Sequence, residues 1–362
     1  MTAAREAQAL DEWAALLRER GALPAGAPLP IRKIAASESV GPLPDDVGAY
    51  VRGDAVVGLS ARRCGLESVP ASMAELTSLE TLDLDGNPLA FLPDGIDRLQ
   101  ALRTLSLYGS ALTSVPAAIG ALERLEYLSL GRAPITSVPD GVWALRSLRT
   151  LIVAETRLSS VPEGIGRLTQ LETLDLGHNE LAALPDALGS ISSLGSFLYL
   201  SHNRLTHVPP ALTRLSALRY LNVTHNRLTT LPEAIGDMKG LVELRLYGNQ
   251  LRAVPDAIGG LAALQELHLS DNGLERLPGA IGHLRSLTHL DLRNNALAAL
   301  PAEVRDLESL AFLDLRANRL TAVPAAVEAL PRLRKLDLRW NKLEAPRAWR
   351  EEMARRGCAV YV

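Results

Sequence analysis

The 362-residue chain is poor in aromatic residues, which make up 4% of it, although 47% of its residues are hydrophobic. A large core is therefore possible, and it must be aliphatic. The formal net charge of −3 provides no basic field, so we expect no general attraction to nucleic acid. No apolar run has the length that crosses a bilayer, so we expect no membrane association.

The first residues, MTAAREAQALDEWAALLRER, lack a basic start followed by an apolar run. We therefore expect no secretory signal and a cytoplasmic location. Lysine is also rare, since only four of the 38 basic residues are lysine. A GC-rich bacterial genome that favours arginine codons would explain this bias. Avoidance of ubiquitination inside a eukaryotic host would explain it as well, because charge alone does not distinguish the two residues.

A repeat of 23 residues runs through most of the sequence from Val56 onward. Each copy reads LxxLxLxxNxL, followed by Leu-Pro or Val-Pro and an apolar turn, as in LTTLPEAIGDMKG. The alternation in LxLxx predicts a short strand with inward leucines. The apolar spacing of three to four after the proline predicts a helical turn. Coils of this kind bury their leucines only by stacking, so the repeats predict one elongated core.

Thirteen copies begin at Val56, Leu79, Leu102, Leu125, Leu148, Leu171, Leu194, Leu218, Leu241, Leu264, Leu287, Leu310 and Leu333. From 56 to 343 the chain resembles the leucine-rich repeat proteins of the LPxxIGxL type, which include Scribble- and Erbin-like scaffolds, plant Ras-group-related proteins and bacterial proteins. The resemblance covers about four-fifths of the chain. It implies a right-handed α/β solenoid, a curved horseshoe with a parallel sheet on its concave face and short helical turns on its convex face. It also implies binding rather than catalysis.

The ends differ from the repeats. We expect residues 1–55 to form a helical cap, with Leu10, Trp13, Ala14 and Leu17 on one face, followed by an irregular lead-in. Residues 344–362 should form a second cap, in which Pro346 opens a helix, Gly357 ends it and CAVYV closes the sheet. Cys64 and Cys358 lie at opposite ends of the solenoid, so they cannot form a disulfide.

An asparagine recurs at one place in most copies and predicts a buried ladder of amide hydrogen bonds. Ser110, Ala133 and Thr156 replace it in three consecutive copies, where we expect the softest part of the solenoid. One copy is also a residue too long, since Leu194 and Leu218 are 24 apart. The surplus lies between Leu194 and Leu198, and Gly195 suits a bulge that re-aims Phe197. A tolerated insertion without function is the alternative.

Aromatic residues concentrate at the positions expected to face outward from the sheet, which hold five of the seven tyrosines and two of the three phenylalanines. Tyrosine and arginine are common anchors of protein interfaces. Packing of the aromatic side chains on one another is the alternative explanation. We predict a partner-binding surface formed by Phe197, Tyr199, Tyr220, Asn222, Arg245, Tyr247 and His268.

Other polar groups are weaker candidates. His178, His202 and His225 recur at one position, but no carboxylate or thiol completes a metal site in that row, so we expect no metal and no cofactor. Asp291, Asp314 and Asp337 should pair with Arg293, Arg316 and Arg339 across the sheet. His268 near Asp291 is the closest approach to an acid–base pair, on a face too open to exclude water, so we expect no enzyme.

The sequence therefore predicts a monomeric, non-enzymatic module that binds a protein or peptide. A bacterial effector delivered into host cells by non-classical secretion, acting there as a scaffold or decoy, is the alternative. A purely structural role through self-association of the repeats is a third possibility. The three differ in their partners: a ligand of the sheet face, a host protein, or a second copy of the chain.

Overall fold

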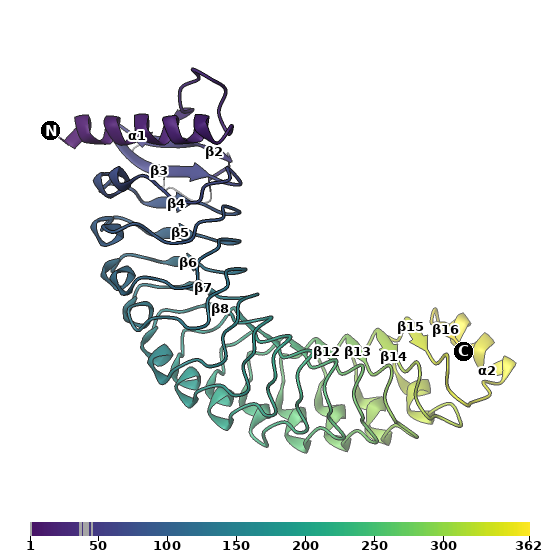
Figure 1. The fold of residues 1–362 in the computed structure, drawn as a ribbon. Coiled ribbons are helices and arrows are strands. Elements are labelled where there is room, and N and C mark those ends of the chain that lie inside the picture. Colours follow the sequence, from purple (N-terminus) through teal and green to yellow (C-terminus); the bar gives the residue numbers. More distant parts are fainter. Residues whose placement is uncertain (1, 36–37, 39–42, 45) are drawn as a thin grey trace. The chain divides into compact units, whose positions relative to one another are not determined.

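The computed structural model describes residues 2–35, 38, 43–44 and 46–362, which form two compact units, Met1–Glu180 and Leu181–Val362. Within each unit, short strands lie side by side in sequence order along one layer, and 3₁₀ turns form the opposite layer (Figure 1). This arrangement confirms the predicted leucine-rich repeat solenoid. Among the described residues, no helix is long and apolar enough to cross a membrane.

The first unit begins with the predicted cap. Helix α1 (Thr2–Glu19) packs on strand β3 (Ala55–Ala61) and on the first 3₁₀ turn. Trp13 and Leu17 are fully buried, whereas Leu10 is only partly covered. The Glu6 carboxylate is also buried, and it accepts a hydrogen bond from the Val56 amide at 3.1 Å. The helix thus covers the apolar end of the core and satisfies a backbone group there.

Two strands lie in the lead-in between this helix and β3. Strand β1 (Ile31–Lys33) pairs in parallel with β2 (Val47–Arg52), and β2 pairs antiparallel with β3. A register shift between Tyr50 and Val51 interrupts the β2–β3 pairing. The repeat pattern does not extend into β1 and β2, since β1 is exposed throughout and the four central residues of β2 are all buried.

Strands β4 to β15 each contain three residues, of which the central one is buried in every case. In the first unit they are β4 (Thr81–Asp83), β5 (Thr104–Ser106), β6 (Tyr127–Ser129), β7 (Thr150–Ile152) and β8 (Thr173–Asp175). In the second they are β9 (Phe197–Tyr199), β10 (Tyr220–Asn222), β11 (Glu243–Arg245), β12 (Glu266–His268), β13 (His289–Asp291), β14 (Phe312–Asp314) and β15 (Lys335–Asp337). Neighbours within a unit pair in parallel with leucine opposite leucine, as Leu221 lies opposite Leu244.

The helical turns on the other side are 3₁₀ rather than α. They span Ala71–Glu75, Ile96–Arg98, Ala117–Ala121, Val142–Ala144 and Glu163–Arg167 in the first unit, and Asp186–Ser190, Pro210–Arg214, Ile235–Asp237, Asp256–Gly260, Gly279–His283, Ala302–Asp306 and Ala325–Ala329 in the second. Most follow a proline in extended conformation, such as Pro255, and each buries at least one side chain, such as Ile258. A single short turn is the length at which 3₁₀ geometry is common.

The predicted amide ladder is present. Asn226, for example, donates to the carbonyl groups of Leu200 and Val223 and accepts from the Leu205 amide at 2.9 Å. Three consecutive coils lack the asparagine. In the first of them, the hydroxyl group of Ser110 is buried with no hydrogen-bond partner among the described residues. Ala133 carries no polar group at all. The softness of this region is not tested by the geometry and stays a prediction.

The chain after the last repeat forms a helix and a strand. Helix α2 (Arg347–Arg355) follows Pro346, and Gly357 adopts a left-handed conformation with φ of 81°. Strand β16 (Ala359–Tyr361) then pairs in parallel with β15. Within this cap, the side chains of Met353 and Cys358 are buried.

The additional residue of the long copy is taken up before strand β9. Ser196 forms a bend there, and the Gly195 carbonyl accepts a hydrogen bond from the Arg219 amide at 3.0 Å. Strands β9 and β10 remain in the regular register, with Leu198 opposite Leu221. Because this pairing shows no register shift, the bend at Ser196, before the strand, accommodates the insertion, and no bulge lies within the strand.

Candidate partner-binding surface

Three of the predicted residues form one cluster of rings on the outward face of β9 and β10. The ring centroid of Tyr199 lies 5.0 Å from that of Tyr220 and 5.9 Å from that of Phe197, and the Phe197 and Tyr220 centroids are 5.6 Å apart. Phe197 is 44% exposed, whereas the two tyrosines are partly buried. The alternation of side chains along the strands turns these residues outward while Leu198 and Leu221 fill the core.

Arg245 extends this cluster onto β11. Its guanidinium group lies over the Tyr220 ring, 5.5 Å from the centroid, and its Nε donates to the Glu243 carboxylate. Cation–π contact and ion pairing together fix an otherwise flexible side chain. We call Phe197, Tyr199, Tyr220 and Arg245 the aromatic patch.

The other predicted site residues lie beside this patch rather than in it. Asn222 is 9% exposed, and its side-chain oxygen accepts from the Thr224 amide at 3.1 Å, so it supports the backbone more than it faces solvent. Tyr247 stands edge-on to the His225 ring, with 5.2 Å between centroids.

Burial raises the pKa of Tyr220, so its hydroxyl stays protonated at neutral pH.

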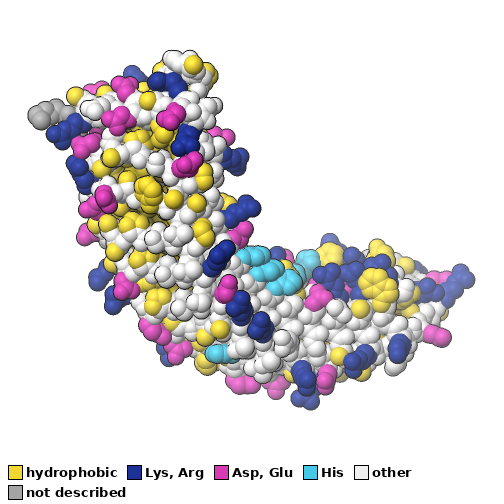
Figure 2. Space-filling view, viewed as in Figure 1, with side chains coloured by type: hydrophobic (Ala, Val, Ile, Leu, Met, Phe, Trp, Pro, Cys, Tyr) yellow, Lys and Arg dark blue, Asp and Glu magenta, His cyan; other side chains and the backbone are white. Residues whose placement is uncertain are grey.

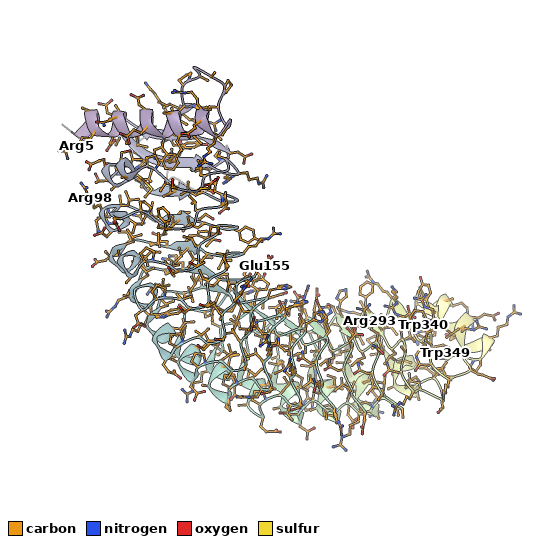
Figure 3. All side chains as sticks on the ribbon, in the orientation of Figure 1. Arg5, Arg98, Glu155, Arg293, Trp340 and Trp349 are labelled. Carbon is orange, nitrogen blue, oxygen red and sulfur yellow. The ribbon has the colours of Figure 1, made fainter. Side chains whose placement is uncertain are left out.

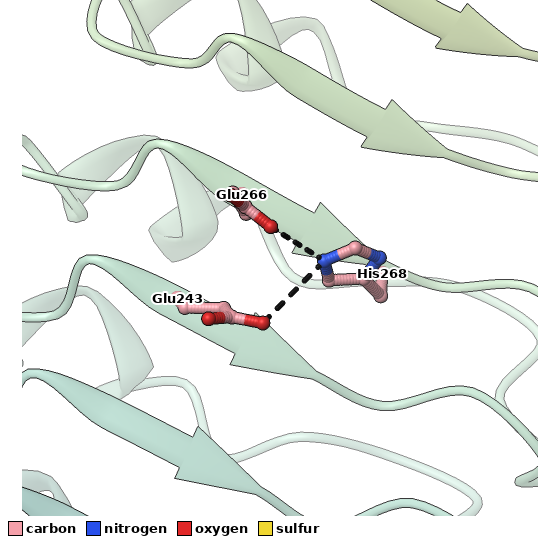
Figure 4. Close-up of side chains that lie close together, drawn as sticks. All are labelled: Glu243, Glu266 and His268. Atoms are coloured by element: carbon pink, nitrogen blue, oxygen red, sulfur yellow. Dashed lines mark hydrogen bonds and ion pairs between the residues drawn. The ribbon is translucent and has the colours of Figure 1, made fainter.

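His268 does not contact Asp291 in the manner of an acid–base pair. Its Nε2 lies 3.2 Å from an oxygen of Glu266 and 3.7 Å from an oxygen of Glu243 (Figure 4). All three side chains are partly buried on the outward face of β11 and β12. These three residues occupy two different positions in neighbouring copies of the repeat, so a comparison of residues at one repeat position does not bring them together.

The recurring histidines are explained by the backbone. His178, His202 and His225 all have φ between 50° and 54°, and the residue before the ladder position has a positive φ in the other repeats too. Histidine, asparagine, aspartate and glycine tolerate this left-handed conformation better than most residues. The rings of His202 and His225 lie 4.2 Å apart.

Each of the strands β13 to β15 ends in an aspartate, and an arginine two residues later forms an ion pair with it. The Arg316 guanidinium group donates to the Asp314 carboxylate through both Nε and Nη2, and the Arg339 guanidinium group lies 2.7 Å from the Asp337 carboxylate. One contact crosses between strands, from Arg316 to Asp337 at 3.6 Å. The predicted residues therefore do pair, but mostly within one repeat, between the last residue of a strand and the arginine two residues later, and not across the sheet as predicted. Figure 2 shows basic side chains gathered beside hydrophobic ones in this part of the second unit.

Two exposed aromatic residues accompany these charges. Trp340, labelled in Figure 3, is 71% exposed, and the guanidinium groups of Arg316 and Arg339 lie 5.9 and 5.5 Å from its ring centroid. Phe312 stacks on His289 at 4.4 Å, beside a shallow pocket of about 250 Å³. Strand β12 separates this second group along the sheet from the aromatic patch, whose last member, Arg245, lies on β11.

The thiols are poor candidates for nucleophiles. Cys64 and Cys358 are 6% and 2% exposed, and burial raises the pKa of both. A raised pKa disfavours the thiolate, which is the reactive form.

Comparison with known proteins supports the same architecture. A family model described as a leucine-rich repeat region matches residues 113–209 and 197–294, and a leucine-rich repeat model matches residues 78–99. No curated protein is significantly similar to the chain. A solved leucine-rich repeat protein of Leptospira interrogans is 33% identical over 82% of each chain, with a TM-score of 0.70.

Two further solved structures are similar. An internalin of Listeria monocytogenes has a TM-score of 0.72 at 20% identity, over 84% of this chain and 86% of its own, which is a likeness of fold alone. A plant peptide hormone receptor, solved in complex with the peptide RGF2, has a TM-score of 0.68 at 28% identity. It covers 82% of this chain, which spans only 47% of the receptor chain.

Proposed function

The chain belongs to the leucine-rich repeat proteins, and from that premise we propose that it is a non-enzymatic module that binds a protein or peptide at the aromatic patch. Proteins of this family typically bind other proteins and are generally not enzymes. The proposal assigns the contact to the outward face of β9 to β11, with Phe197, Tyr199, Tyr220 and Arg245 as its centre.

The observation that carries the proposal is the exposed ring of Phe197 in contact with two tyrosines. An exposed phenylalanine is unfavourable in water unless a partner covers it. The neighbouring rings restrict its movement, so little conformational entropy is lost when a ligand binds. Arg245 adds a charged donor at the edge of the apolar centre, an arrangement common at the energetic centres of interfaces.

The plant receptor supports the class of ligand. It is a relative of this chain at 28% identity and was solved with a peptide bound. A peptide or an extended segment of a protein fits a surface made of short parallel strands, because each strand offers side chains at regular spacing. We therefore propose an extended peptide segment with an apolar side chain opposite Phe197.

The test is capture of a partner from lysate of the source organism, followed by measurement of its Kd. Wild type is compared with Phe197→Ser and with the double variant Tyr199→Ala/Tyr220→Ala. Truncation of interface anchors weakens binding by at least about tenfold, so we expect that loss in the double variant. Far-UV circular dichroism and thermal melting establish that each variant is folded.

Phe312→Ser is the matched control, because Phe312 is the first residue of β14 as Phe197 is of β9, and it is 38% exposed. This control should bind the partner as wild type does. A partner that loses affinity for Phe312→Ser but not for Phe197→Ser would move the site to β13 to β15 and refute the proposal. Equal binding by all variants would also refute it.

A further inference from the structure

Three side chains that ligate metals in proteins come together on β11 and β12. Glu243, Glu266 and His268 each present one ligand atom, and all three atoms lie within 4.8 Å of one another. The two glutamates are partners in the register of the two strands, and His268 follows Glu266 by two residues on the same face. The regular repeat therefore fixes the three groups around one point above the sheet (Figure 4).

The distances are close to those of a coordinated ion. Histidine nitrogen and carboxylate oxygen ligands lie about 2.0–2.2 Å from zinc, so in a tetrahedral site they are roughly 3.3–3.5 Å from one another. The His268 Nε2 already lies 3.2 Å from the Glu266 oxygen and 3.7 Å from the Glu243 oxygen. Small torsions of the two glutamate side chains would bring all three onto one ion.

The local charge also favours a cation. Two carboxylates on adjacent strands repel each other, and their nearest positive group is Arg245, which binds Glu243. Arg245 Nε donates to the same Glu243 oxygen, Oε1, that lies 3.7 Å from the His268 Nε2, so an ion at this point would replace that contact. The Glu266 carboxylate contacts only the imidazole among the described residues. A divalent ion would neutralise both carboxylates at once.

We propose that Glu243, Glu266 and His268 form a binding site for a first-row divalent metal ion such as Zn²⁺. One nitrogen and two oxygen ligands suit this class of ion better than Ca²⁺ or Mg²⁺, which prefer oxygen alone. Three protein ligands leave a fourth position open toward solvent, available to water or to a donor atom of a bound molecule. The site is distinct from the rings of the aromatic patch, and its binding does not require a partner.

Isothermal titration of the full chain with Zn²⁺ alone, in chelator-free buffer, tests the proposal. We expect one bound ion per chain in wild type. His268→Ala and Glu266→Gln should each weaken binding at least about tenfold, since both remove a ligand. Glutamine keeps the size of the side chain, so a loss in that variant is not a loss of fold.

The paired rings of His202 and His225 are the competing site, and the double variant His202→Ala/His225→Ala is the matched control. This variant should bind Zn²⁺ as wild type does. Binding lost only in the control variant would assign the ion to the histidine row and overturn the proposal. Equal binding in all variants, or no binding up to millimolar Zn²⁺, would overturn it too.

Arg245→Met provides a test of opposite sign. It removes the cation that competes for Glu243, so we expect tighter Zn²⁺ binding than in wild type.

The visible absorption of bound Co²⁺ gives a second readout, because a tetrahedral site absorbs far more strongly than an ion held loosely by exposed carboxylates. A weak, octahedral-type spectrum would contradict the proposed ligand set. Since no partner is present, these results are independent of the partner-binding proposal.

Discussion

Replacement of Asn226 by alanine is the perturbation that most directly tests the amide ladder. Asn226 is 7% exposed, and its oxygen accepts from the Leu205 amide at 2.9 Å. Its nitrogen donates to the carbonyl groups of Leu200 at 2.9 Å and Val223 at 3.2 Å. Asn226→Ala removes all of these bonds without removing much apolar surface.

The expected cost follows from what each partner retains. The Leu200 and Val223 carbonyl groups keep a second donor, from Asn203 and Asn249 respectively. The Leu205 amide depends on Asn226 alone, and an unsatisfied buried amide costs about 1–3 kcal/mol. The lost carbonyl bonds add about 1 kcal/mol at most, so we expect a decrease of about 1–4 kcal/mol in the free energy of unfolding.

Ser110→Ala is the control at the same repeat position. The Ser110 hydroxyl is buried without a partner among the described residues, so its removal should leave the free energy of unfolding unchanged or raise it slightly. Urea unfolding followed by far-UV circular dichroism measures both variants. Because long repeat arrays need not unfold in one step, amide hydrogen exchange of the coils around each position is measured as well. If Ser110→Ala destabilised the protein as much as Asn226→Ala, the hydrogen-bond account of the ladder would be refuted.

Further predictions concern amide hydrogen exchange, the protonation of a buried carboxyl group and the reactivity of the two thiols. Amides in residues 110–156 should exchange faster than those in residues 203–249, because the amide ladder is absent from the former; equal protection would contradict this. Burial raises the pKa of Asp85, so its contribution to stability is present below the unfolded-state pKa near 3.9 and is lost as pH rises through the folded-state pKa. Asp85→Asn should therefore stabilise the protein at pH 7 but not at pH 3, as thermal melting at both values will show. Cys64 and Cys358 should react with a disulfide reagent much more slowly in the native protein than in urea, and fast native reaction would contradict their burial.

Most of the fold could be predicted because the same residues return in every repeat. Inward leucines such as Leu221, the ladder asparagines and the prolines before each 3₁₀ turn all have one structural purpose, and each recurs at fixed spacing. The pairing of β1, β2 and β3 could not be predicted in this way, because this arrangement occurs once in the chain and no repeated pattern marks it.

The candidate surface was predicted in part. Outward positions in the strands follow from alternation, so Phe197, Tyr199 and Tyr220 were expected to lie together. Two features of this surface do not follow from the repeat pattern. Whether Asn222 faces solvent depends on its bond to the Thr224 amide. The approach of His268 to two glutamates depends on side-chain torsions, which the repeat does not specify.

Site-specific photo-cross-linking tests the central claim most directly. A photoreactive phenylalanine analogue replaces either Phe197 or Phe91, which are both exposed, at 44% and 60%, but differ in that Phe91 lies outside the strands. In lysate of the source organism, the partner-binding account predicts a discrete cross-linked protein from position 197 and none from position 91. Cross-links from position 91 alone, or the same products from both, would contradict it.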